Sequence, residues 1–147
     1  MEVIIADSPA EVAKLGADYI DRLLHSNPAA VLGLATGSTP IALYQQLIER
    51  YRRQQISFAE VRSFNLDEYI GLAPEHPQSY RSFMNRQLFD HIDIDIGNTH
   101  IPDGTADPMA EAQRYEACIS DTGGIDLQIL GLGSNGHIGF NEPCSSL

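Results

Sequence analysis

The chain of 147 residues has the length of one domain, residues 1–147. Its 20 acidic residues outnumber 9 Lys and Arg and give a net charge of −11. This charge argues against a nucleic-acid or anionic-membrane binder, because both need a basic face. No stretch approaches the roughly 18 apolar residues of a membrane span, and no signal-peptide pattern opens the sequence. We therefore expect a cytoplasmic protein with neither kind of partner.

The first half of the chain alternates apolar runs with helical patterns. Residues 2–6 form a short β-branched run that predicts a strand, and a capping box over 7–11 begins a helix that ends near His25. The apolar run 30–35 is typical of a central parallel strand that is covered on both faces. A second helix is expected over 39–51, with its apolar residues on one side.

The second half continues the alternation. A strand over 62–66 precedes a polar loop and a helix over 79–88, and a short strand is expected at 98–101. A helix over 107–120 and a last strand at 125–130 follow. The order βαβαβαβαβ predicts an α/β fold: a mostly parallel, doubly wound, Rossmann-like sheet with helices on both faces.

The two cysteines, Cys118 and Cys144, form no CxxC pair and no cluster with histidine. Free thiols in a reducing cytosol are the expected state, and the sequence shows no metal-ligand spacing. For Cys144, beside the last polar loop, packing is the favoured role and redox sensitivity the alternative.

Small and polar residues over 33–40 follow the second expected strand. Small side chains let a backbone approach a ligand closely, and the next helix offers free N–H groups at the positive end of its dipole. An anion cradle and a plain turn capped by Thr39 carry equal weight on these residues alone. A Walker loop is excluded because no Gly-Lys-Ser/Thr follows.

Two adjacent carboxylates, Asp67 and Glu68, follow the third expected strand. Successive residues of an extended segment point to opposite sides, so only one of them is expected to face a cleft. A desolvated carboxylate there can move protons on a carbon next to a carbonyl. By itself this pair is more often a solvated acidic loop.

The last polar cluster, residues 131–143, contains four glycines together with His137 and Glu142. An imidazole shuttles protons near neutral pH, and a nearby carboxylate orients it and raises its basicity. A structural turn with an exposed histidine is the less favoured alternative. All three clusters lie at the carboxyl ends of expected parallel strands, which is the edge where open α/β sheets bind ligands. This shared placement favours a functional site.

Four stretches, in this order, resemble the glucosamine-6-phosphate deaminase family: Gly33–Pro40, Phe64–Tyr69, His76–Tyr80 and Gly136–Pro143. The resemblance covers the whole chain. It implies aldose–ketose isomerisation and deamination of glucosamine 6-phosphate to fructose 6-phosphate and ammonia. Such an enzyme is a hydrolase of carbon–nitrogen bonds in N-acetylglucosamine and amino-sugar catabolism.

The resemblance also implies a role for each cluster. The loop after the second strand would hold the sugar phosphate through Thr36, Gly37, Ser38 and Thr39. Asp67 would be the base that carries a proton between C2 and C1 of the sugar. No metal or redox cofactor is needed for this reaction.

In the last cluster, the resemblance makes His137 the acid/base that opens the pyranose ring, assisted by Glu142 and Asn135. Glu68 and Gly136 are weaker candidates for contact with the substrate. Many relatives carry Asp where this chain has Asn135, and an amide can orient a histidine but cannot relay a proton. Glu142 is therefore the expected partner of His137.

The chain ends at Leu147, directly after this cluster, whereas members of the family continue through further strand–helix units. We therefore expect the chain to lack its C-terminal units and their cationic phosphate ligands, and to have little or no activity alone. The sequence leaves open a homo-oligomer and an allosteric effector.

Two other functions compete with the deaminase. A 6-phosphogluconolactonase shares the phosphate loop and a Gly-His loop, but lactone hydrolysis has no use for an enediol base such as Asp67. A non-catalytic sugar-phosphate sensor is the second alternative, although it would need neither Asp67 nor His137. A purely structural role explains none of the three clusters.

Overall fold

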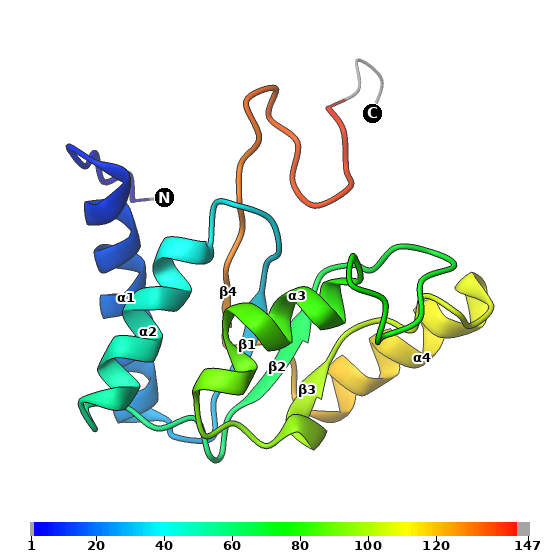
Figure 1. Ribbon diagram of the computed structural model, residues 1–147, viewed down its shortest axis with the longest axis horizontal. Coiled ribbons are helices and arrows are strands. Elements are labelled where there is room, and N and C mark those ends of the chain that lie inside the picture. Colours follow the sequence, from blue (N-terminus) through cyan, green and yellow to red (C-terminus); the bar gives the residue numbers. More distant parts are fainter. Residues whose placement is uncertain (1, 144–147) are drawn as a thin grey trace.

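The computed structural model describes residues 2–143 (Figure 1). Helices and strands alternate along this part of the chain. In order they are α1 (Pro9–Ser26), β1 (Val31–Leu34), α2 (Ile41–Arg52), β2 (Arg62–Asn65), α3 (Tyr80–Gln87), the 3-10 helices η1 (Phe89–His91) and η2 (Ile96–Asn98), β3 (Thr99–His100), α4 (Pro108–Asp121) and β4 (Leu127–Gln128).

The described strands form one parallel sheet in the order β3-β2-β1-β4. The chain moves outward from β1 to β2 and β3, and α4 then returns it to β4 on the other side of β1. Leu32 of β1 is in register with Ser63 of β2 and with Leu127 of β4. Such a reversal of direction opens a crevice at the carboxyl ends of the two strands that flank it, here β1 and β4.

Helices cover both faces of the sheet, which confirms the predicted doubly wound architecture (Figure 1). On one face, Leu32 and Leu34 pack with the apolar sides of α1, α2 and α3. On the other, Val31 and Phe64 pack with Tyr115 of α4. All four residues of β1 are buried, because a strand in this position has neighbours on both faces and both edges.

The capping signals of the sequence fix where two helices begin. The Ser8 hydroxyl accepts a hydrogen bond from the Glu11 N–H at the start of α1, and Asp107 accepts one from the Ala110 N–H at the start of α4. In each helix a proline occupies the first turn, where its missing N–H leaves no bond unmade.

The expected first strand, residues 2–6, is not a strand. Val3 is 71% exposed and Ile5 is 93% exposed, and neither pairs with the described sheet. A β-branched run records only a preference for extended backbone, and a strand forms where a neighbour accepts and donates its hydrogen bonds. The described segment therefore runs from α1 onward as αβαβαβαβ.

The edge strands are shorter than the sequence predicts. β3 has two residues, within the expected 98–101, and β4 has two, within the expected 125–130. Each pairs with one neighbour in the described sheet, so fewer backbone groups enter a ladder than in β1 or β2. The apolar flanks still pack, since Ile101 and Ile129 lie against the main core.

Burial within α1 predicts a large difference between two substitutions. Ile20 is fully buried and Val12 is 58% exposed on the same helix. We expect Ile20→Ala to lower the free energy of unfolding by about 2–5 kcal/mol, because it leaves a cavity in the core. Val12→Ala, the matched control, should change it by less than about 0.5 kcal/mol. Urea unfolding followed by circular dichroism measures both, and equal losses would contradict the described core.

Candidate active site

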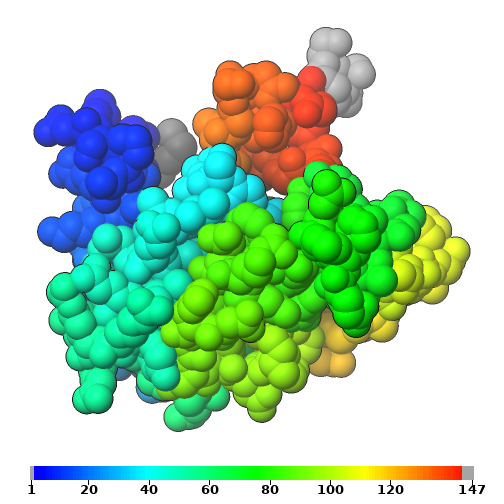
Figure 2. All heavy atoms as spheres, in the orientation of Figure 1, coloured from blue at the N-terminus to red at the C-terminus, as the bar shows by residue number. Residues whose placement is uncertain are grey.

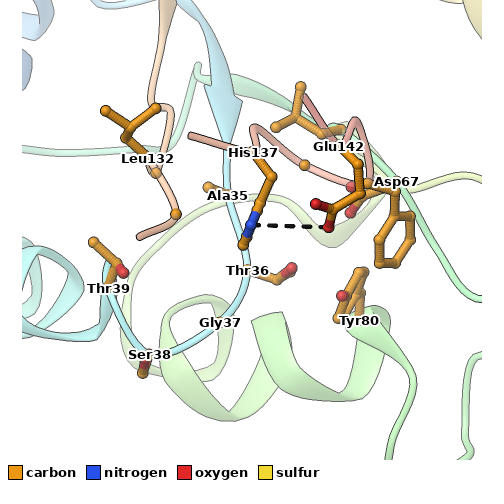
Figure 3. A pocket seen from close by; sticks show the side chains of 15 residues that line it. Ala35, Thr36, Gly37, Ser38, Thr39, Asp67, Tyr80, Leu132, His137 and Glu142 are labelled. Atoms are coloured by element: carbon orange, nitrogen blue, oxygen red, sulfur yellow. Dashed lines mark ion pairs between the residues drawn. The ribbon is translucent and has the colours of Figure 1, made fainter. Parts of the chain in front are cut away.

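The three polar clusters surround one cavity of about 390 Å³ at the carboxyl ends of β1, β2 and β4 (Figure 3). Figure 2 shows the segment after β4 (orange to red) seated over the cyan segment that follows β1 and the green segment that follows β2. The lining residues come from these three segments and, for Tyr80, from the start of α3: Ala35, Thr36, Gly37, Ser38, Thr39, Leu66, Asp67, Tyr80, Gly131, Leu132, Gly133, His137, Gly139, Phe140 and Glu142.

The segment between β1 and α2 forms one wall. Gly37 has a φ of +92°, a conformation that side chains with a Cβ rarely adopt. The turn is fixed by the buried Tyr44 hydroxyl, which donates to the Ala35 carbonyl. The N-cap of α2 is Pro40 rather than the expected Thr39, and within the described residues no side chain caps this helix. Its first N–H groups therefore stay available, and the Thr39 hydroxyl lines the cavity instead.

Asp67 contributes a carboxylate to the cavity from the end of β2. It is half-buried, and burial, assisted by the neighbouring negative charge of Glu68, raises the pKa of the Asp67 carboxyl. Gly139 passes so close that a Cβ on it would lie 3.1 Å from Asp67 Oδ2. The close backbone of the last loop thus removes water from one side of the carboxylate.

A chain of hydrogen bonds holds the imidazole. His137 Nδ1 lies 2.6 Å from Asn135 Oδ1, and the His137 N–H donates to the same oxygen over 3.2 Å. The Asn135 amide in turn donates to Glu142 Oε2 over 2.7 Å. Glu142 Oε1 is 3.9 Å from His137 Nδ1, so its charge also acts on the ring directly (Figure 3).

These bonds determine which ring nitrogen carries the proton. The Glu142 carboxylate can only accept, so the Asn135 NH₂ must face it and the Asn135 oxygen must face His137. An amide oxygen is also only an acceptor, and therefore Nδ1 of the neutral ring is protonated. The lone pair is on Nε2, which leaves a proton acceptor on a side chain that lines the cavity.

Three residues predicted from the sequence lie outside the lining of the cavity. Asn135 acts on it through His137, as described. Gly136 has a φ of +89° and forms the turn between them. Glu68 does not line this cavity, as expected for one of the two neighbouring carboxylates, and its carboxylate accepts from the backbone N–H groups of Tyr80 and Arg81 at the start of α3. Cys144 lies outside the described residues.

An aromatic wall was not foreseen from the sequence. The Tyr80 ring, in the first turn of α3, lies 4.9 Å from the Tyr69 ring and 5.9 Å from the Phe140 ring between centroids. Burial, and to a lesser extent the Tyr69 hydroxyl, raise the pKa of the Tyr80 phenol, so it stays protonated as a donor. The sequence signal that could have located Tyr80 is Ser79, a predicted helix cap, because it places the next residue at the carboxyl edge of the sheet.

One imidazole, His137, and two carboxylates, Asp67 and Glu142, line the cavity. Of the described residues, neither a Lys nor an Arg lines it. An anion in this cavity would therefore be bound by hydroxyls and backbone N–H groups. No three described His, Cys, Asp or Glu side chains are placed to bind a metal ion together.

Within the described part of the chain, every helix is too short or too polar to cross a membrane.

The hydrogen bond from His137 to Asn135 predicts a measurable tautomer. In ¹⁵N NMR spectra at a pH where the ring is neutral, His137 should show a protonated Nδ1 and a bare Nε2. Asn135→Ala should shift the ring toward protonated Nε2, because the acceptor at Nδ1 is gone. The matched control is Asn141→Ala, which removes an amide of the same loop that donates to the Ile138 carbonyl. A bare Nδ1 in the unsubstituted chain would contradict the arrangement.

Comparison with known proteins agrees with this geometry. Residues 6–139 match the family described as glucosamine-6-phosphate isomerases/6-phosphogluconolactonase. A glucosamine-6-phosphate deaminase of Hahella chejuensis is 69% identical over 147 residues, and one of Cellvibrio japonicus is 59% identical over 148. Both alignments cover all of this chain and 56% of the relative.

Solved structures share the fold. A monomeric glucosamine-6-phosphate deaminase aligns with a TM-score of 0.94 and 43% identity, over 97% of this chain and 60% of that one. A 6-phosphogluconolactonase of Thermotoga maritima aligns with a TM-score of 0.75 and 25% identity, over 95% and 62%. The chain thus spans little more than half the length of these relatives. Because the family match extends over most of the sequence, the chain belongs to the family of glucosamine-6-phosphate isomerases and 6-phosphogluconolactonases.

Proposed function

We propose that this chain carries the proton-transfer groups of an enzyme that converts glucosamine 6-phosphate to fructose 6-phosphate and ammonia. The observation that carries the proposal is the placement of two different proton carriers on one cavity. Asp67 is a carboxylate whose pKa is raised by burial, and His137 is an imidazole whose proton position is set by Asn135. Both line the space beside the anion-binding segment after β1.

The sugar phosphate is assigned to the segment after β1. Thr36, Ser38 and Thr39 supply hydroxyls, Gly37 permits a close backbone approach, and the N-terminus of α2 points its dipole to the same place. A phosphate held by hydroxyls and N–H groups binds more weakly than one that is also paired with Arg or Lys. Phosphate affinity is therefore expected to be modest for the described residues.

His137 is assigned to opening of the sugar ring. That step moves a proton from the anomeric hydroxyl to the ring oxygen, so it needs one group that accepts and then returns a proton. The bare Nε2 of His137 can accept, and the cation that forms is stabilised by Glu142 Oε1 at 3.9 Å. Asn135 keeps the ring oriented but exchanges no proton itself.

Asp67 is assigned to the isomerisation. Its carboxylate takes the proton from C2 and delivers it to C1, while one proton of the substrate's own ammonium group ends on the C1 oxygen. The C1=O double bond is thereby replaced by a C2=N double bond, which leaves C2 at the oxidation level of a ketone. Water then adds at C2 and the carbon–nitrogen bond breaks, which releases ammonia. A carboxylate with a raised pKa is a stronger base for this step.

A lactonase is the second candidate, because the matched family includes 6-phosphogluconolactonases. It is less favoured because hydrolysis of a lactone uses no carbon base, and Asp67 then has no task. We place the deaminase reaction in amino-sugar catabolism in the cytoplasm, where a free thiol such as Cys118 stays reduced. It would be classed as a hydrolase of carbon–nitrogen bonds.

The test is release of ammonia from glucosamine 6-phosphate by the product of the complete reading frame, with the 147-residue chain alongside. Asp67→Asn should lower kcat by at least about 100-fold, since an amide cannot take the C2 proton, while KM changes little. The control, Asp90→Asn, removes an exposed carboxylate and should act like the unsubstituted enzyme.

The same preparations are offered 6-phosphogluconolactone. Hydrolysis of the lactone without ammonia from the amino sugar would replace the proposal with the lactonase. Tight binding of glucosamine 6-phosphate with no turnover of either compound would replace it with a sugar-phosphate sensor.

A further inference from the structure

Glu68 makes an unusual set of contacts for an acidic loop residue. Its Oε1 accepts from the N–H groups of Tyr69, at 2.8 Å, and Tyr80, at 2.9 Å. Its Oε2 accepts from the Arg81 N–H at 3.1 Å. Tyr80 and Arg81 are the first two residues of α3, whose N–H groups have no partner within the helix. One carboxylate therefore joins the loop after β2 to a helix that begins twelve residues later.

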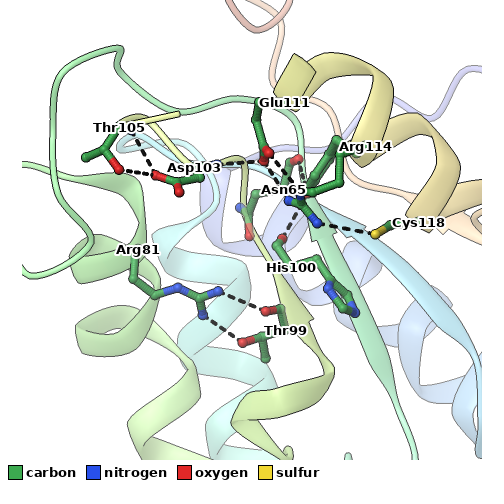
Figure 4. A network of polar contacts seen from close by, with 10 residues as sticks. Asn65, Arg81, Thr99, His100, Asp103, Thr105, Glu111, Arg114 and Cys118 are labelled. Carbon is green, nitrogen blue, oxygen red and sulfur yellow. Dashed lines mark hydrogen bonds and ion pairs between the residues drawn. The ribbon is translucent and has the colours of Figure 1, made fainter. Parts of the chain in front are cut away.

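The side chain of Arg81, whose backbone N–H binds Glu68, does not itself bind this carboxylate. The Arg81 guanidinium donates instead to the Thr99 hydroxyl and carbonyl, at 2.7 and 2.8 Å (Figure 4). The partners of Glu68 are thus backbone N–H groups and the positive end of the α3 dipole. Fixed backbone partners hold a side chain in one place more firmly than a flexible cation does.

The groups that Glu68 joins are two walls of the cavity. Asp67 precedes it in the sequence, and Tyr80 carries the ring against which Phe140 packs. The far end of the same loop is held by a second contact, from the Gly71 N–H to the Gly104 carbonyl at 2.6 Å. A Cβ on Gly104 would collide with the Tyr69 carbonyl, so the loop can lie this close only to glycine.

We propose that Glu68 is a positioning residue for Asp67: its carboxylate fastens the loop after β2 to the first turn of α3 and so holds the base and the Tyr80 ring at fixed places on the cavity wall. This rests on the proposed function, in which Asp67 transfers the proton between C2 and C1. In this proposal Glu68 does not make the contact with the substrate that the sequence led us to expect, but acts on the reaction through Asp67.

The charge of Glu68 acts on the base as well. Burial is the larger cause of the raised pKa of the Asp67 carboxyl, and the negative charge of Glu68 is the second. On the cavity side, Asp67 is also faced by Tyr80, His137 and Glu142. Asp67 and Glu68 also line a second cavity of about 280 Å³, whose further titratable groups are Asp103, Glu111, Tyr115 and Glu116.

Two carboxylates of the second cavity, Glu111 and Asp103, already have partners. Glu111 binds the Arg114 guanidinium at 2.6 Å, and Asp103 accepts from the Thr105 hydroxyl and N–H (Figure 4). Glu68 is therefore the carboxylate whose removal should change both the position and the basicity of Asp67.

Two variants separate these effects in the product of the complete reading frame. Glu68→Gln keeps the length of the side chain and removes its charge. It loses at least one hydrogen bond from a backbone N–H group, so kcat should fall by about tenfold while KM for glucosamine 6-phosphate changes less than about twofold. The acidic limb of kcat/KM should move to lower pH, because removal of a like charge lowers the pKa of Asp67.

Glu68→Asp keeps the negative charge and shortens the side chain by one methylene group. Its kcat should fall by a similar factor, while the acidic limb stays where it is in the unsubstituted enzyme. The matched control is Glu116→Gln, which removes an exposed carboxylate of α4 from the wall of the second cavity and leaves the contacts of Glu68 intact. It should change neither kcat nor the pH profile.

Three outcomes would overturn the proposal: an unchanged kcat in both variants, an acidic limb that Glu68→Gln leaves in place, or a raised KM at unchanged kcat, which would mean direct contact with substrate. A separate readout is the pKa of the Asp67 carboxyl from ¹³C NMR of the folded variants. It should fall in Glu68→Gln and not in Glu68→Asp. This readout distinguishes a failure of the present proposal from a failure of the deaminase reaction, because it needs no turnover.

Discussion

The position of β1 between two parallel neighbours is the constraint on which the rest of the site depends. Its pairing with β2 and β4 brings the carboxyl ends of all three strands to one edge. Gly33 allows this pairing to be close, because a Cβ there would overlap the Gln128 side chain of β4. The segment between β1 and α2, Asp67 and His137 then converge on one cavity although the first and last of them are separated by about a hundred residues of chain.

Hydrogen bonds to the strand ends keep this edge in place. Tyr44 holds the Ala35 carbonyl beyond β1, and the Asn65 amide donates to Leu34, the last residue of that strand. Tyr115 of α4 donates to the carbonyls of Asn65 and His100, at 2.8 and 2.9 Å, and so joins the ends of β2 and β3. Three buried side chains thus hold the places where the segments that line the cavity leave the sheet.

The sequence predicts the fold well where both local and long-range signals agree. The capping residues Ser8 and Asp107 locate their helices because a cap is a local interaction. Residues 2–6 mislead because their β-branched side chains suit a strand, whereas a strand also needs a partner that a local pattern does not reveal.

In the candidate site, too, the sequence predicts what depends on local geometry and misses what depends on packing. That only one of Asp67 and Glu68 lines the cavity is what the geometry of an extended chain predicts. Which of the two faces the cavity, and that the other binds the start of α3, depends on where a helix twelve residues later packs. The contribution of Tyr80 was missed for the same reason.

The central claim is that Asp67 moves one proton from C2 to C1 inside a cavity partly closed to water. The most direct test is to supply the product of the complete reading frame with glucosamine 6-phosphate that carries deuterium at C2. The account predicts that part of the deuterium appears at C1 of the fructose 6-phosphate, because a half-buried carboxylate exchanges its proton with water slowly enough to return some of it. Fructose 6-phosphate with hydrogen from water alone at C1, or no release of ammonia, would contradict it.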